Sequence, residues 1–147
     1  MKTFNIILAI LFCELAGGIG SLFTAPSIGT WYAGLVKPSF NPPNWIFGPV
    51  WTTLFALMGV ALYLIWKSRA MIPFFIQLAL NVLWSVIFFG LHSPFFALLE
   101  IAVLWLAIFW TIIACRKVSK AAAYLLMPYL LWVSFASALT FSIWRLN

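Results

Sequence analysis

Residues 31–51 read WYAGLVKPSFNPPNWIFGPVW. The stretch holds three Trp, four Pro and one Lys, and it lies between two long apolar segments. A connection between helices is usually short and plain, whereas proline fixes the backbone and tryptophan offers a broad ring at small entropic cost. The stretch therefore predicts an ordered loop that forms a lid or rim over a flat, apolar molecule or surface.

The composition of the whole chain predicts a lipid bilayer as its solvent. The 147 residues are 66% hydrophobic and 7% charged, with a mean hydropathy of +1.14. A water-soluble domain could not bury so much apolar surface. Charge-free runs at 38–66, 70–99 and 121–144 each exceed the roughly 20 residues that cross a hydrocarbon core. Two further apolar segments contain one Glu each, so the sequence predicts five spans.

The predicted fold is an all-α integral membrane protein, a bundle of five transmembrane helices in one domain over residues 1–147. We expect the helices at about 4–23, 45–66, 71–91, 95–115 and 121–144, with a Trp/Pro-rich outer loop at 24–44. Asn41 or Asn44 can cap the second helix, and Ser93-Pro94 makes a cap followed by a first-turn proline. The polar turns that begin at Lys67 and Arg116 are short, so neighbouring helices should pack antiparallel.

The basic residues divide unequally between the two ends of this bundle. One end carries Lys2, Lys67, Arg69, Arg116, Lys117 and Lys120, and the other carries Lys37 and Arg145. Because cations gather in cytoplasmic loops, we expect a cytoplasmic N-terminus and an outer C-terminus, in what the small size suggests is a prokaryotic cell membrane. The net charge of +6 then reflects topology, and no nucleic acid partner is expected.

Polar residues inside the spans are candidate functional groups, because lipid leaves them without partners. Gln77, Asn81 and Ser85 recur at intervals of four and should share one face of the third helix. Two interpretations stay open for this row. It forms hydrogen bonds between helices, or it lines a ligand cavity beside Trp84 and Phe88.

Glu14 and Glu100 are the only acidic residues, and each lies well inside a predicted helix. An ionised carboxylate there costs roughly 2.5 kcal/mol or more, so each should be protonated, hydrogen-bonded or facing water. The sequence does not decide their roles, and it does not pair them as a general acid and base. With one His and no Cys-x-x-Cys, neither a metal site nor a cofactor is expected, and a disulfide between Cys13 and Cys115 is not expected either.

Aromatic residues on two helices predict a cavity within the bundle. Tyr129, Trp132 and Ala136 share one side of the fifth helix, and Trp51 and Phe55 are one turn apart on the second. Three further tryptophans, Trp45, Trp66 and Trp144, fit an interfacial belt at the helix ends. Trp51, Trp84 and Trp132 lie too deep for a belt, which favours a pocket over plain packing.

Small residues recur at four-residue intervals on the first helix, at Ala9, Cys13, Gly17 and Ser21. Such a face lets another helix approach closely. That helix belongs either to the same bundle or to a second copy of the chain, so a homodimer is an open alternative.

The ordered motifs resemble one membrane protein family. They are W-Y-x-x-L-x-K-P-S-F-x-P-P-x-W-x-x-G-P-V-W at 31–51, L-A-L-N-x-x-W at 78–84, F-F-G at 88–90, P-Y-L-L-W at 128–132, F-A-S-x-L-x-F at 135–141 and W-R-x-N at 144–147. The pattern is similar to the tryptophan-rich sensory protein and translocator protein family (TspO/MBR), once called the peripheral benzodiazepine receptor. The resemblance covers nearly the whole chain and implies five helices.

The resemblance implies a receptor or transporter that binds porphyrins such as protoporphyrin IX in a cavity beneath the first loop. Carried onto this chain, the ligand-binding positions are Trp31, Tyr32, Pro42, Trp51, Phe55, Asn81, Phe88, Trp132 and Ala136. Animal members are also associated with cholesterol, but Phe141 stands where the sterol-recognition pattern wants Tyr, so a sterol is not assigned as the native ligand.

Two alternatives accompany the receptor hypothesis. Some family members are reported to degrade protoporphyrin in light, and an enzyme of that kind would use Trp51 and Trp132 in a radical process, since no conventional catalytic motif is present. The other alternative is a structural membrane protein whose pocket holds only lipid.

Overall fold

The computed structural model describes residues 5–147 of the chain. Almost all of these residues lie in helices. The chain contains α1 (Ile6–Ile28), a short 3-10 turn η1 (Tyr32–Gly34), α2 (Asn44–Leu64), α3 (Met71–Ser85), a π-helical turn η2 (Val86–Gly90), α4 (Pro94–Arg116), α5 (Lys120–Leu125) and α6 (Met127–Leu146). Five segments are long and apolar enough to cross a membrane, because η2 continues α3 and α6 continues α5. The five predicted helices are thus confirmed.

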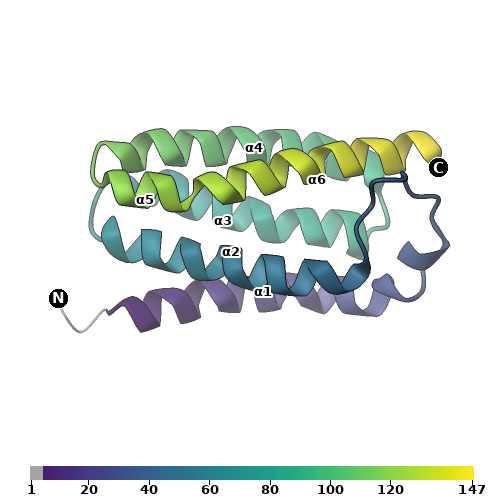
Figure 1. Cartoon of the computed structure of the whole chain (residues 1–147), viewed down its shortest axis with the longest axis horizontal. Coiled ribbons are helices and arrows are strands. Elements are labelled where there is room, and N and C mark those ends of the chain that lie inside the picture. Colours follow the sequence, from purple (N-terminus) through teal and green to yellow (C-terminus); the bar gives the residue numbers. More distant parts are fainter. Residues whose placement is uncertain (1–4) are drawn as a thin grey trace.

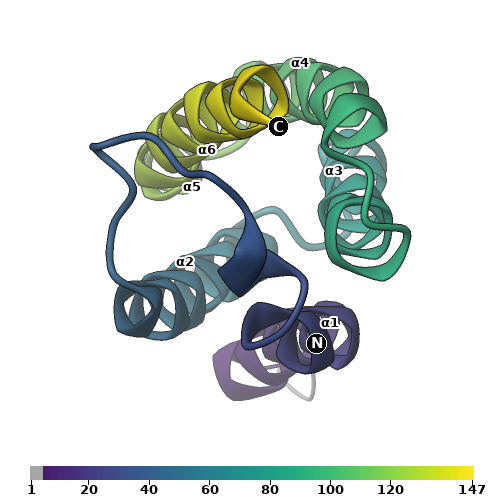
Figure 2. The same cartoon turned by 90° about the vertical axis from the view of Figure 1, so that its right-hand side faces the viewer.

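The helices are arranged in a ring around a central axis rather than in layers (Figure 1, Figure 2). Going round the ring, α1 contacts α2, α2 contacts α5, α6 contacts α4, α4 contacts α3, and α3 returns to α1. The prediction that the helices joined by the polar turns at Lys67 and Arg116 pack antiparallel holds for α4, which contacts α5 and α6. It fails for α2 and α3, which α1 separates in Figure 2.

The first helix and its loop differ from the predicted boundaries. We expected the helix to end near residue 23, but α1 continues to Ile28 with Pro26 in its last turn. Proline removes only one hydrogen bond there, and the Thr30 hydroxyl donates to the Pro26 carbonyl (2.9 Å). The loop is therefore shorter than the predicted 24–44 and comprises residues 29–43.

The last span has a break that the predicted 121–144 helix did not include. Helix α5 ends at Leu125, and α6 begins at Met127 with Pro128 in its first turn. Pro128 has no N–H to continue the hydrogen-bond ladder, and one residue, Leu126, separates the two helices.

The predicted caps were right at one helix and wrong at another. Ser93 caps α4, where its hydroxyl accepts from the Phe96 N–H (3.3 Å) and Pro94 follows. Neither Asn41 nor Asn44 caps α2, because Pro43 holds the cap position and Asn41 binds inside the loop. A proline at the cap already fixes the backbone for the turn that follows.

The basic residues gather at one end of the ring, as expected. Lys67 and Arg69 lie in the turn before α3, and Arg116, Lys117 and Lys120 lie around the start of α5, at the end of the bundle opposite the loop (Figure 1). Lys37 and Arg145 lie at the loop end. Lys2 lies outside the described residues. Cys13 and Cys115 are both buried and free.

Candidate functional site

The centre of the ring contains a cavity of about 410 Å³ near the loop end. This volume lies within the range of roughly 300 to 1,000 Å³ typical of small-molecule sites. Side chains from every membrane-spanning segment line it. The aromatic lining residues are Tyr32, Phe47, Trp51, Phe55, Trp84, Phe88, Phe89 and Trp132, and the polar ones include Glu14, Ser21, Thr24, Thr52, Asn81, Ser85 and Thr140.

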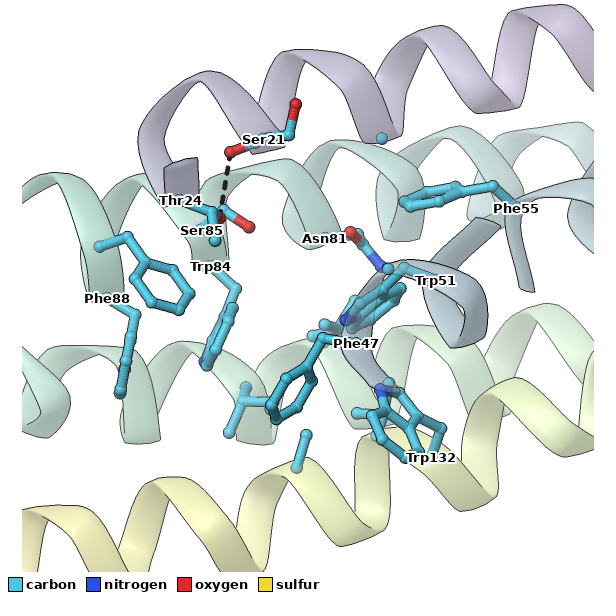
Figure 3. Close-up of a pocket in the computed structure, with 18 of the residues that line it drawn as sticks. Ser21, Thr24, Phe47, Trp51, Phe55, Asn81, Trp84, Ser85, Phe88 and Trp132 are labelled. Carbon is cyan, nitrogen blue, oxygen red and sulfur yellow. Dashed lines mark hydrogen bonds between the residues drawn. The ribbon is translucent and has the colours of Figure 1, made fainter. Parts of the chain in front are cut away.

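One wall of the cavity consists of indole and phenyl rings from α2 and α6. The Trp51 and Trp132 rings are 6.5 Å apart and nearly perpendicular, at 89°. Phe47 packs edge-on against Trp132 with centroids 6.0 Å apart. Such edge-to-face contacts hold rings in fixed orientations without stacking their faces together. Figure 3 shows the three rings grouped along one side of the cavity.

A second wall depends on the π-helical turn η2. The Leu91 N–H donates to the Val86 carbonyl (2.9 Å), five residues back, which widens the helix. Both Phe88 and Phe89 within this turn are buried and line the cavity. The Phe88 ring stacks on the Trp84 ring, with centroids 4.9 Å apart and an interplanar angle of 14° (Figure 3).

A buried hydrogen-bond network stands behind the aromatic walls. The Asn81 amide N–H donates to the Tyr129 hydroxyl (2.7 Å), and that hydroxyl donates to Gln77 Oε1 (2.7 Å). Gln77 and Tyr129 do not line the cavity, whereas Asn81 and Ser85 do. Gln77 and Asn81 therefore join helices, and Asn81 and Ser85 face the cavity; that the cavity holds a ligand stays a prediction.

The loop covers the outer end of the cavity through Tyr32, which is 4% exposed. The Tyr32 hydroxyl donates to Asn41 Oδ1 (3.2 Å), and the Lys37 ammonium lies 4.6 Å above the Tyr32 ring. Burial raises the pKa of the Tyr32 phenol, and the hydrogen bond to Asn41 offsets part of that increase. The phenol is therefore a neutral donor at physiological pH.

The C-terminal residue ties the loop to α6. Asn147 Oδ1 accepts from the Val36 N–H (3.1 Å), and Asn147 Nδ2 donates to the Val36 carbonyl (2.8 Å). A side-chain amide that pairs with both backbone groups of one residue fixes that residue in two directions. The cover over the cavity is thus anchored at its midpoint.

The comparisons with known proteins agree on one family. The family model described as "TspO/MBR family" matches residues 9–145. The "Tryptophan-rich protein TspO" of Archaeoglobus fulgidus is 48% identical over 100% of this chain and 99% of its own length. The human "Translocator protein" is 42% identical over 88% of this chain and 82% of its own. The "Tryptophan-rich sensory protein" of Cereibacter sphaeroides is 37% identical over 80% of this chain and 77% of its own.

This chain belongs to the TspO/MBR family. Because the family match and the five spans coincide over almost the whole chain, it is a multi-pass integral membrane protein of that family.

Most of the TspO/MBR ligand positions expected from the sequence converge on the cavity. Its lining includes Tyr32, Trp51, Phe55, Asn81, Phe88, Trp132 and Ala136. Trp31 and Pro42 are not part of it. Trp31 instead stacks on His92 (4.5 Å, 11°) and meets Phe88 edge-on (5.4 Å), so it supports the cavity wall from outside. That these residues bind a ligand stays a prediction.

The sequence interpretation missed the contribution of α1 to this TspO/MBR cavity. Its small face was predicted to admit another helix, and Ala9 and Cys13 are indeed fully buried within the bundle. Gly17 and Gly20 line the cavity instead, where they lie against Phe55 and Ser85. The signal was present as the cluster of glycines at 17, 18 and 20, which exceeds what one helix contact requires.

The two acidic residues occupy different environments in this TspO/MBR protein. Glu14 lines the cavity, whereas Glu100 does not. Both Glu100 oxygens are buried without a hydrogen-bond partner in the described part of the chain. A carboxyl group buried in a membrane span without partners is energetically costly.

Proposed function

We propose that this protein is a membrane receptor or transporter that binds a porphyrin of the protoporphyrin IX type in the central cavity. The observation that carries the proposal is the convergence of rings from α2, α6 and η2 on one cavity beneath a tied loop. A porphyrin is a broad planar π-system, and offset or edge contacts with indole rings are favourable for such a guest.

The polar lining suits a ligand that is apolar over its faces and polar at a few positions. Asn81, Ser85 and Thr140 place amide and hydroxyl groups among aromatic walls. A few polar groups in an apolar pocket orient a guest more than they hold it. The names of the relatives, "Translocator protein" and "Tryptophan-rich sensory protein", agree with transport or sensing by the family.

The test is a titration of protoporphyrin IX in the dark, followed by quenching of Trp fluorescence, in native protein and in Asn81→Leu. We expect saturable binding, weakened about three- to tenfold in Asn81→Leu, because one hydrogen bond contributes about 0.5–1.5 kcal/mol. Asn44→Leu is the matched control, since Asn44 is exposed at the start of α2 and outside the cavity.

Absence of saturable quenching in the native protein would contradict the proposal and leave the structural alternative, in which the cavity holds lipid. Equal loss in Asn81→Leu and Asn44→Leu would show that Asn81 does not contact the guest. Cholesterol added as a competitor tests the sterol alternative in the same titration.

The geometry of Trp51 favours a second candidate function, light-dependent breakdown of the bound porphyrin. The Trp51 ring lies 6.5 Å from Trp132 and 6.3 Å from Tyr129, so two further oxidisable rings are close to it. An illuminated porphyrin bound against Trp51 could take an electron from this group in the presence of oxygen.

Illumination of the porphyrin complex separates this candidate from a receptor. If the protein degrades its guest, the porphyrin absorbance should fall in light in the native protein and remain stable in Trp51→Phe and in Trp132→Phe. Trp110→Phe is the control, because Trp110 is exposed on α4 and absent from the cavity. Bleaching at the same rate in all four proteins would mean that the rings take no part.

We also propose that the end of the bundle rich in Lys and Arg is cytoplasmic, in a prokaryotic cell membrane. Five of the basic residues behind this proposal, Lys67, Arg69, Arg116, Lys117 and Lys120, lie in or beside short turns, where such a bias determines orientation. Accessibility of a cysteine at Gly34 to a membrane-impermeant thiol reagent in intact cells would test it.

A further inference from the structure

The contact between α1 and α2 is tight at the end far from the loop. Cys13 and Met58 are fully buried there. A Cβ atom added at Gly59 would overlap the Ile10 backbone and lie 2.7 Å from the Ile10 nitrogen. Helices approach this closely only where one of them presents a very small residue. The two helices therefore leave no gap between them near Ile10 and Gly59.

Toward the loop the same two helices separate. Gly17 still faces the Phe55 ring, whose carbons would lie 2.7 Å from an added Cβ. One residue further on, at Gly18, and across at Gly48, no atom of the described chain lies within 4 Å of an added Cβ. Figure 2 shows the loop ends of α1 and α2 apart beneath the loop. A close contact is thus followed by open space.

Four residues mark the two edges of this open space. Gly18 and Ser21 lie on α1, and Gly48 and Thr52 lie on α2. All four line the cavity and are also exposed. Spacings of three and four residues place each pair on one face of its helix. We call this opening the α1/α2 slit, and it leads from the cavity to the side of the bundle.

The side chains next to the slit indicate that it opens to lipid rather than to water. Leu15 and Leu22 on α1 are 64% and 70% exposed, and Trp45 on α2 is 73% exposed. These residues belong to spans of membrane length. Large apolar side chains exposed on such spans face acyl chains.

Two other routes into the cavity are closed. On the far side of α1, a Cβ added at Gly20 would lie 3.3 Å from the Ser85 hydroxyl, so α1 and α3 are in contact. At the loop end, Tyr32 is covered and bound to Asn41, and Asn147 ties Val36 to α6. A guest that comes from water would have to break these bonds.

We propose that the cavity exchanges its guest with the hydrocarbon interior of the bilayer through the α1/α2 slit, so that its ligands are bilayer-dissolved planar amphiphiles. This inference rests on the proposed function only for the identity of the guest. The hydroxyls of Ser21 and Thr52 at the slit, with Glu14 further along the cavity wall, supply partners for the polar edge of a guest, which lipid does not.

A labelling experiment tests the route without any porphyrin. Ala136→Cys places a thiol in the cavity wall, and the native chain, whose two cysteines are buried, is the blank. In reconstituted vesicles we expect the bilayer-soluble N-phenylmaleimide to label this thiol, and we expect Gly18→Leu with Gly48→Leu to slow the labelling at least tenfold. Gly34→Leu is the matched control, a loop glycine that also has open space around it, and should change the rate less than twofold.

Three results would overturn the inference. Ala136→Cys could be labelled at the same rate with and without Gly18→Leu and Gly48→Leu. A negatively charged thiol reagent could also label Ala136→Cys as fast as N-phenylmaleimide does. Alternatively, Asn147→Ala, which unties the loop, could speed labelling by the charged reagent to the rate of the apolar one. Thr52→Leu is a milder filled variant that repeats the test if the double variant melts below the native protein.

Binding kinetics then separate this inference from the proposed function. With protoporphyrin IX delivered from donor vesicles, Gly18→Leu with Gly48→Leu should slow both association and dissociation at least tenfold. If the native protein binds no porphyrin while labelling still depends on the slit, the proposed function fails and the route stands. If porphyrin binds at unchanged rates in the filled protein, the route fails and the function stands.

Discussion

Replacing Gly59 by alanine should destabilise the protein by about 3 kcal/mol, a fall of roughly 6–12 °C in Tm. The added Cβ would overlap the backbone of Ile10, which cannot rotate away as a side chain could. The two helices would have to separate along the part of their contact that contains Ala9, Cys13 and Met58. Thermal unfolding in detergent, followed by circular dichroism, measures the effect.

Gly18→Ala is the matched control for this prediction. It adds the same methyl group to a helical glycine of α1 that has open space around it. Alanine is favoured over glycine in a helix by about 1 kcal/mol, so this variant should be as stable as the native protein or slightly more stable. If Gly59→Ala and Gly18→Ala had the same melting temperature, the result would contradict a close approach of α1 and α2.

Truncating both Trp51 and Trp132 to alanine should weaken protoporphyrin IX binding at least thirtyfold. Each ring lines the cavity, and an aromatic pair contributes about 0.5–1.5 kcal/mol beyond the area that it buries. The two rings also orient each other at 89°, so losing one should disturb the other. Quenching of the remaining Trp residues, or the shift of the porphyrin absorbance band, measures the affinity.

Trp110→Ala with Trp144→Ala is the control, because both rings are exposed and neither lines the cavity. This pair should bind porphyrin with less than a threefold change. Equal weakening in the two double variants would indicate that tryptophan affects binding through bundle stability, and melting temperatures of both would confirm that explanation.

The parts of the fold that follow from local sequence were predictable. Apolar runs of membrane length gave the five spans, and Ser93-Pro94 gave the start of α4. The aromatic wall was also predictable, because Trp51 and Trp132 lie too deep in their helices to belong to an interfacial belt. Each of these features depends on one segment at a time.

Features that depend on two segments were not predictable in the same way. That α1 separates α2 from α3 follows from how glycines at 17, 20 and 59 meet other helices, which no single segment contains. The π-helical turn at Val86–Gly90 was not predictable either, because it contains no proline and its one glycine, Gly90, is its last residue. Asn147 could not be linked to Val36 from sequence, because 111 residues separate them.

Two glycines of α1 that line the cavity determine how much space it offers to the proposed ligand. Gly17 and Gly20 form cavity wall without side chains, and a methyl group at Gly20 would lie 3.3 Å from Ser85 while the aromatic rings on α2 and α6 stayed in place. Under the proposed function, a larger residue at position 20 would narrow the cavity from α1 and leave Trp51 and Trp132 unchanged, so the size of an accepted ligand could vary separately from these two rings.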